Sequence, residues 1–178
     1  MPFAYYDRLS PARRRIYERS DGIAALGLPP GFDFGATVAS IRAALAGGNR
    51  LALQRACQAL CTALADGYKV PPVRVFVLAR RPSGDFGELH GLYEPLEGRR
   101  RARITVWMRT AARRQVVAFR SFLRTLVHEL LHHLDYELFA LEETFHTEGF
   151  YKRESSLANA LFTQESAAMA PGRVALPE

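Results

Sequence analysis

Five consecutive residues carry the clearest chemical signal in the chain, the HExxH pattern His128-Glu129-Leu130-Leu131-His132. On a helix, residues four apart lie about 40° apart around the axis and one turn along it, so both imidazoles can reach one metal ion. Glu129 points about 100° away from the first histidine, so it can act as a general base toward a water molecule on the metal. Zinc lowers the pKa of such a water toward about 7, where a carboxylate base suffices. The pattern therefore predicts a zinc site with His128 and His132 as ligands and Glu129 as the catalytic base.

A catalytic zinc ion takes three protein ligands and keeps one open position, so a third ligand must come from elsewhere. His146 follows the HExxH pattern after 13 intervening residues, enough to finish one helix, turn and begin another near the metal. Glu154 is the alternative, as a carboxylate on the following helix. His133 points about 100° away from its neighbour and is a poor ligand. Asp135 lies too far along the axis to bind the same ion; it either accepts a hydrogen bond from a ligand imidazole or is structural.

The segment HELLHHLDYELFALEETFHTEGFYKRESSL resembles the SprT-like (Spartan-like) zinc metallopeptidases of the gluzincin-like zincin group. That family pairs HExxH with a distal histidine in a short HGxxF-like motif, and the matching positions here are His146 and Phe150. Thr147 stands where the family usually has glycine. The resemblance covers about residues 73–161, whereas the first 70 residues match nothing that we can name. The zinc ligands that the resemblance implies are His128, His132 and His146.

The resemblance also implies a zincin-like fold in which a mixed sheet packs on the HExxH helix. The strand at residues 103–108 is then expected to border the cleft, where a substrate peptide in extended form pairs with it through main-chain hydrogen bonds. Trp107 lies in this strand, on the face of Arg103 and Thr105, so it is expected either to line the cleft, partly exposed, or to pack under the N-terminal helices.

Other residues near the motif allow two interpretations each. Tyr151 or Arg153 can stabilise the oxyanion of a tetrahedral intermediate, or belong to the packing of the last helix. Glu154 can also orient a ligand imidazole. His90 lies in a weak strand far from the motif in sequence, and we interpret it as structural.

Arginines cluster around the strand that precedes the HExxH helix. They can form a phosphate-binding rim beside the cleft, through which nucleic acid is a possible partner, or they belong to a solvated turn. No aromatic stacking pattern accompanies them, which favours the turn. The cluster consists of Arg99, Arg100, Arg101, Arg103, Arg109, Arg113 and Arg114.

Around these residues, the hydrophobic pattern changes period twice and predicts an α+β domain. Helices are expected first, with Ser10 as the cap and Pro11 at the start of one that continues through residues 12–26. A small, mostly antiparallel sheet follows, and then the HExxH helix and a C-terminal helix. The expected helices are 12–26, 36–46, 51–65, 110–139 and 147–164, and the expected strands are 73–79, 87–94 and 102–108.

Length and composition fit one folded domain. The chain has 178 residues, 48% of them hydrophobic, which excludes wholesale disorder. We expect a single domain over residues 1–165, divided into a helical part at 1–70 and a sheet with the HExxH core at 71–165, followed by a flexible tail at 166–178. Cys57 and Cys61 lie four apart on a predicted helix, where they are expected to be small buried hydrophobes.

The charge and the N-terminus bear on location and partners. The net charge is +6, and only Lys69 and Lys152 of the 24 basic residues are lysines. This balance permits binding to acidic partners, but it also fits a solvated surface with an arginine bias. No apolar run approaches the roughly 18 residues of a membrane span, and no secretory signal precedes the first helix. We therefore expect a cytoplasmic protein that does not associate with membranes.

The sequence as a whole predicts a zinc metallopeptidase that acts on a protein or peptide substrate, including DNA-associated proteins. The alternative of another class is a DNA-associated binding protein whose zinc site is structural or vestigial. A metal hydrolase acting on a non-peptide amide is a third possibility, because the same site polarises any carbonyl.

Overall fold

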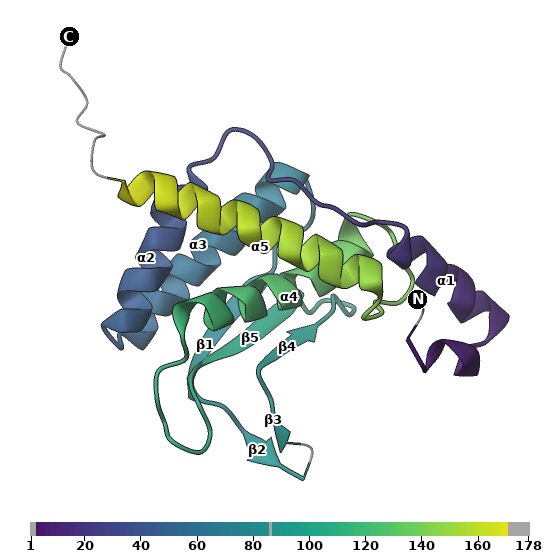
Figure 1. Ribbon diagram of the computed structural model, residues 1–178, viewed down its shortest axis with the longest axis horizontal. Helices are drawn as coiled ribbons and strands as arrows, with labels where there is room; N and C mark the ends of the chain where they lie inside the picture. The colour runs from purple at the N-terminus through teal and green to yellow at the C-terminus, as the bar shows by residue number, and fades with distance from the viewer. Residues whose placement is uncertain (1–2, 86, 171–178) are drawn as a thin grey trace.

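The computed structural model describes residues 3–85 and 87–170 and has an α+β architecture (Figure 1). The helices among these residues are η1 (Tyr6–Arg8), α1 (Pro11–Asp21), α2 (Phe34–Ala46), α3 (Arg50–Tyr68), α4 (Phe119–Glu137) and α5 (Glu148–Met169). The strands are β1 (Arg74–Arg80), β2 (Ser83–Gly84), β3 (Gly87–Glu88), β4 (Gly91–Glu94) and β5 (Arg103–Arg109). The predicted α+β class is thus confirmed.

Side-chain caps begin four of the α-helices, because a side-chain oxygen there accepts a hydrogen bond from an otherwise unpaired backbone N–H. The cap predicted at Ser10 is confirmed, with Pro11 following it in the first turn of α1. The capping residues are Ser10, Asp33, Asn49 and Thr147.

The main sheet is mixed, with the strand order β1-β5-β4, so the expectation of a mostly antiparallel sheet is wrong. β5 pairs antiparallel with β4 and parallel with β1. Along the chain, β4 follows β1 but does not pair with it, and β5 then inserts between these two strands. Periodicity places strands along the sequence, but it carries no information on this insertion.

The insertion makes β5 a central strand with both faces covered. Trp107 is only 7% exposed and Thr105 only 6%, so Trp107 does not line the cleft. The edge of the sheet on the side of the HExxH helix is instead β4.

The two edges of the sheet differ in how their backbone groups are satisfied. At the β1 edge, side chains of α3 take the place of a further strand. Gln58 accepts from the Val75 N–H (2.8 Å) and donates to the Val73 carbonyl (3.0 Å). Gln54 accepts from the Val77 N–H (3.0 Å). Within residues 3–85 and 87–170, no backbone or side-chain group closes the outer edge of β4 in the same way.

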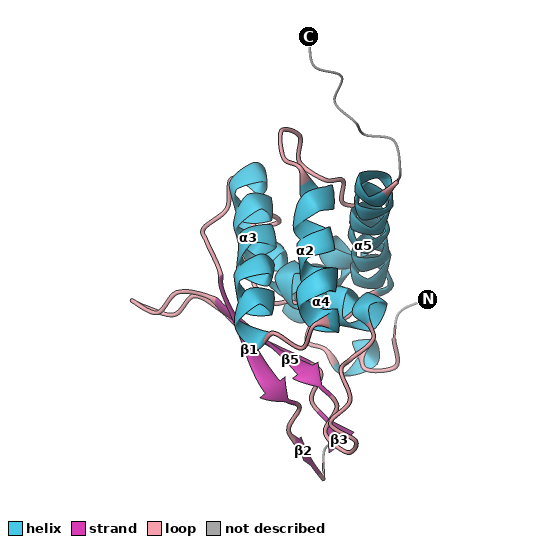
Figure 2. Cartoon of the chain, turned by 90° about the vertical axis from the view of Figure 1, so that its left-hand side faces the viewer, coloured by secondary structure: helices cyan, strands magenta, loops and turns pink. Residues whose placement is uncertain are grey.

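The helices gather on one face of the sheet, as Figure 2 shows. Apolar side chains of α2, α3, α4 and α5 form one core with β1 and β5. Cys57 and Cys61 are both free and buried in this core, as predicted. α1 lies apart from α2 and α3, beside the N-terminal end of α5 (Figure 1).

Several expected boundaries are wrong for tertiary reasons. The first helix ends at Asp21 rather than continuing to 26, since the Ser20 and Ile23 carbonyls accept hydrogen bonds from the Arg153 side chain (2.6 Å each). Residues 110–118 are not helical but fold back on the end of β5, where Val117 N–H donates to the Met108 carbonyl (2.9 Å).

Two further boundaries differ near the sheet and at the C-terminal end. The strand expected at 87–94 is divided into β3 and β4, because β3 pairs with β2 in a separate hairpin. α5 continues to Met169, past the expected end, because buried Glu165 forms an ion pair with Arg42 of α2 (2.5 Å). The start of the expected tail is therefore helical, while residues 171–178 lie outside the described residues.

Candidate metal centre

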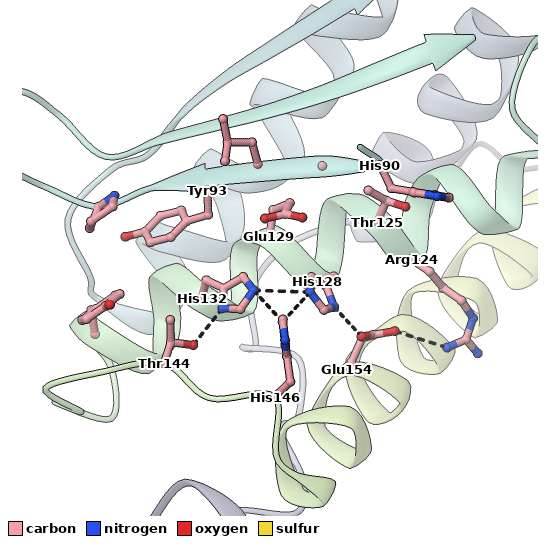
Figure 3. A pocket seen from close by; sticks show the side chains of 14 residues that line it. His90, Tyr93, Arg124, Thr125, His128, Glu129, His132, Thr144, His146 and Glu154 are labelled. Carbon is pink, nitrogen blue, oxygen red and sulfur yellow. Dashed lines mark hydrogen bonds and ion pairs between the residues drawn. The ribbon is translucent and has the colours of Figure 1, made fainter. Parts of the chain in front are cut away.

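The three predicted histidines converge on one point (Figure 3). His128 and His132 come from successive turns of α4, and His146 comes from the loop directly before α5. Their Nε2 atoms form a triangle with sides of 3.0, 3.1 and 3.3 Å. Three nitrogen atoms of one tetrahedral zinc site, each about 2.0–2.1 Å from the ion, lie about 3.3 Å apart. The three side chains therefore fit a single metal ion.

His128 presents the lone pair of Nε2 to this point because its other nitrogen is engaged. Nδ1 lies 2.9 Å from Oε2 of Glu154. A carboxylate accepts hydrogen bonds, so Nδ1 carries a proton. The structure favours orienting a ligand as the role of Glu154 over being one, and the dashed line in Figure 3 joins it to His128.

His132 is oriented through a relay that the sequence does not reveal. The Thr144 hydroxyl donates to Oδ2 of Asp135 (2.8 Å), so its oxygen is left to accept from Nδ1–H of His132 (2.7 Å). Asp135 thus acts on a ligand imidazole indirectly. Burial and the neighbouring histidines lower the pKa of His132 to about 3, which keeps its ring neutral. Thr144 belongs to no sequence motif, and only its position close to His146 in the sequence could have indicated its role.

Arg153 lies behind this relay and not in the pocket. It is fully buried and forms an ion pair with Asp135 (2.8 Å). The oxyanion interpretation of Arg153 is therefore wrong, since burial has removed it from any substrate. Tyr151 is 43% exposed, and its ring stacks on that of His146 with the centroids 5.8 Å apart.

His146 is held by its own turn and by the N-terminal segment. The Tyr5 hydroxyl donates to the His146 carbonyl (2.9 Å). Thr147 begins α5, accepting from the Phe150 N–H (2.9 Å), and has an extended backbone with φ −87°. Because this φ suits any residue, threonine can stand where the resembling family has glycine. The Phe150 ring packs against all three histidine rings.

Glu129 lies beside the histidines under strand β4 (Figure 3). It is 7% exposed, and burial raises the pKa of its carboxyl group to about 7, although nearby His128 opposes this shift. Directly above it, Gly91 has no side chain. A Cβ at Gly91 would lie 2.7 Å from Cγ of Glu129, so a side chain there would force the Glu129 side chain to shift.

An open pocket of about 530 Å³ adjoins the centre. One wall is the β4 segment, with Gly91 and Tyr93 facing α4. His90 lines the pocket at the end near Thr125 and Arg124. Its interpretation as structural stays a prediction. The position of His90 in the pocket could not be predicted from the sequence, because β4 packs beside α4 only in the folded chain. His133, by contrast, is buried and bonded to the Pro71 carbonyl (2.8 Å), as expected of a nonligand.

The arginines considered for a phosphate-binding rim do not form one surface. Arg103 begins β5 and Arg109 ends it, so the two halves of the cluster lie about 20 Å apart along the strand. Arg99, Arg100, Arg101 and Arg103 line a groove of their own.

No family model, curated protein or solved structure matches this chain. Among the described residues, none of the helices combines the length and apolar character that crossing a membrane requires.

Proposed function

We propose that this chain is a zinc-dependent metallopeptidase of the SprT-like kind. The observation that carries the proposal is the convergence of His128, His132 and His146 beside buried Glu129, on the floor of an open pocket. A structural zinc site is closed by four protein ligands, whereas a catalytic site has three and keeps one position open. Three ligands facing a pocket therefore support catalysis over a purely structural ion.

A zinc ion held by the three Nε2 atoms would supply the Lewis acidity that activates water and polarises a carbonyl. The residues of the chain supply the rest. Glu129 takes the proton of the attacking water on its carboxylate and returns it to the leaving amine. Glu154 and Thr144 hold the ligand imidazoles in the required orientation. Tyr151 is a candidate donor to the oxyanion.

A peptide is the substrate that this pocket fits best. The open edge of β4 runs along the pocket, above Glu129. An extended peptide can add to such an edge through main-chain hydrogen bonds, which are independent of side-chain identity. The opposite edge of the sheet is already satisfied by Gln54 and Gln58, so β4 is where a further strand can add.

A Glu129→Gln variant tests the proposal. The amide keeps the shape of the side chain but cannot take a proton, so cleavage of an unstructured protein or peptide is expected to fall at least about 100-fold. Zinc content, measured by elemental analysis, is expected to remain at about one ion per chain, because Glu129 is not a ligand. Glu142→Gln, at an exposed glutamate paired with Arg19, is the matched control and should leave both measurements unchanged.

Two results would contradict the proposal. Undiminished cleavage by Glu129→Gln would remove the general base from the mechanism. A DNA-linked activity that survives this substitution, without peptide cleavage by the native chain, would favour the binding protein with a structural zinc site.

A further inference from the structure

A second concave surface, which we call the arginine groove, lies at the end of β4. It has a volume of about 610 Å³. Its lining residues are Arg74, Phe76, Glu94, Pro95, Glu97, Arg99, Arg100, Arg101 and Arg103. Five arginines face two glutamates there, so the groove has an excess of positive charge.

Most of this charge is not neutralised within the described chain. Arg103 forms an ion pair with Glu94 (2.6 Å) across the β4–β5 pair. Arg99, Arg100 and Arg101 are exposed and make no ion pair with residues 3–85 or 87–170. Three guanidinium groups with no internal partner, held along one concave surface, attract a ligand with several negative charges.

The arginine groove meets the pocket of the metal centre at one residue. Pro95 lines both. A peptide added to the edge of β4 would pass Gly91, above Glu129, and reach Pro95 four residues further along, about 13 Å away. The part of the peptide beyond the scissile bond would therefore arrive at the arginines.

We infer that the arginine groove is a subsite for an acidic stretch of the peptide substrate, starting about four residues from the bond that is cut. This inference rests on the proposed peptidase function. Single-stranded nucleic acid fits less well, because bases need free aromatic faces for stacking. Phe76 is the one aromatic residue among those that line the groove, and the Arg103 guanidinium lies over its ring, 5.4 Å from the centroid.

The test compares two fluorogenic peptides with the full-length, zinc-loaded chain. Both peptides share a neutral cleavage sequence, and one of them also carries three glutamates that start four residues from the scissile bond. A second pair of peptides is the same, except that its three glutamates lie on the other side of the scissile bond. For one of the two placements of the glutamates we expect kcat/KM to be about tenfold higher than for the matching neutral peptide, mainly through a lower KM. The gain should disappear at high salt, because exposed charges are screened.

The variant R99Q/R100Q/R101Q is expected to lose this preference, so that acidic and neutral peptides give a ratio near one. The matched control R8Q/R15Q/R55Q removes three exposed arginines elsewhere, lowers the net charge equally and should keep the preference. Fluorescence anisotropy with the acidic peptide on Glu129→Gln protein gives the same comparison without cleavage.

The outcomes separate the two proposals. Absence of an acidic preference in the native chain, or its survival in R99Q/R100Q/R101Q, overturns the subsite. If the native chain cuts no peptide but the anisotropy still depends on the three arginines, the peptidase proposal fails and the acidic-peptide site stands. If these arginines instead bind only a single-stranded oligonucleotide, the groove is a nucleic-acid site and the inference is wrong.

Discussion

Glu129 of α4 lies directly under Gly91 of the edge strand β4. Gly91 has no positive φ, so its backbone conformation does not require glycine. Space is the reason, since the Glu129 carboxyl occupies the volume that a side chain on β4 would fill. The strand therefore restricts where the Glu129 carboxylate can point, and it does so from a residue without a side chain.

Replacement of Gly91 by alanine is expected to displace the Glu129 carboxylate and lower peptide cleavage at least about tenfold, because small misplacements of a reacting group are costly. Zinc content should not change, since the three histidines do not contact Gly91. Gly27→Ala is the control, because a Cβ there meets nothing within 4 Å. Full activity in Gly91→Ala would show that the carboxylate adapts freely.

At the scale of single residues, the sequence predicts those members of the site that their spacing along the chain brings close to one another. His128, Glu129 and His132 follow from helical geometry, whereas the length of the intervening chain allows either His146 or Glu154, and the folded chain brings His146 to the other two histidines. Thr144 and Gly91 could not be predicted, because each acts through one tertiary contact made after folding.

Arg153 joins three elements around the metal centre. From α5 it reaches Asp135 on α4 and the Ser20 and Ile23 carbonyls at the end of α1. Asp135 in turn fixes Thr144 and, through it, the imidazole of His132. The position of α1 and the orientation of a metal ligand therefore depend on the same buried guanidinium.

We expect Arg153→Met to lower the free energy of unfolding by about 3–5 kcal/mol, because it leaves the Asp135 carboxylate buried without its partner. The adjacent Lys152→Met is the control. Lys152 pairs with Glu148 at the surface, and exposed pairs of this spacing contribute only about 0.3–0.5 kcal/mol. Denaturant unfolding measures both, and equal losses would contradict the role assigned to Arg153.

The positions of helices and strands along the chain could be predicted better than the way in which these elements pair and pack. Helix periodicity predicts α2, α3, α4 and α5 approximately, and the Ser10 cap predicts the start of α1. The parallel pairing of β1 with β5 and the central place of β5 could not be predicted, since both depend on which strands pair.

At the scale of the whole molecule, the metal ligands connect α4 to the loop that starts α5. These helices also contact the sheet and α2, so an ion held there stabilises the folded chain relative to the unfolded one. A ligand present at 1,000 times its Kd adds about 4 kcal/mol to the free energy of unfolding.

Removal of zinc by a chelator is therefore expected to lower the denaturant midpoint of the native chain, and readdition of zinc should restore it. His146→Ala, which lacks one ligand, should respond much less to either treatment. Unfolding curves with and without chelator measure the effect. A native chain that is insensitive to the chelator would contradict a metal bound between these two helices.

The unequal edges of the sheet also limit how this molecule can associate with itself. Gln54 and Gln58 close the β1 edge, so another copy cannot extend the sheet there without displacing them. The β4 edge is open, but it is the edge that faces Glu129. A copy that joined the sheet at β4 would take the place proposed for substrate. Dimers formed through the sheet would thus be inactive, and substrate would act as their competitor.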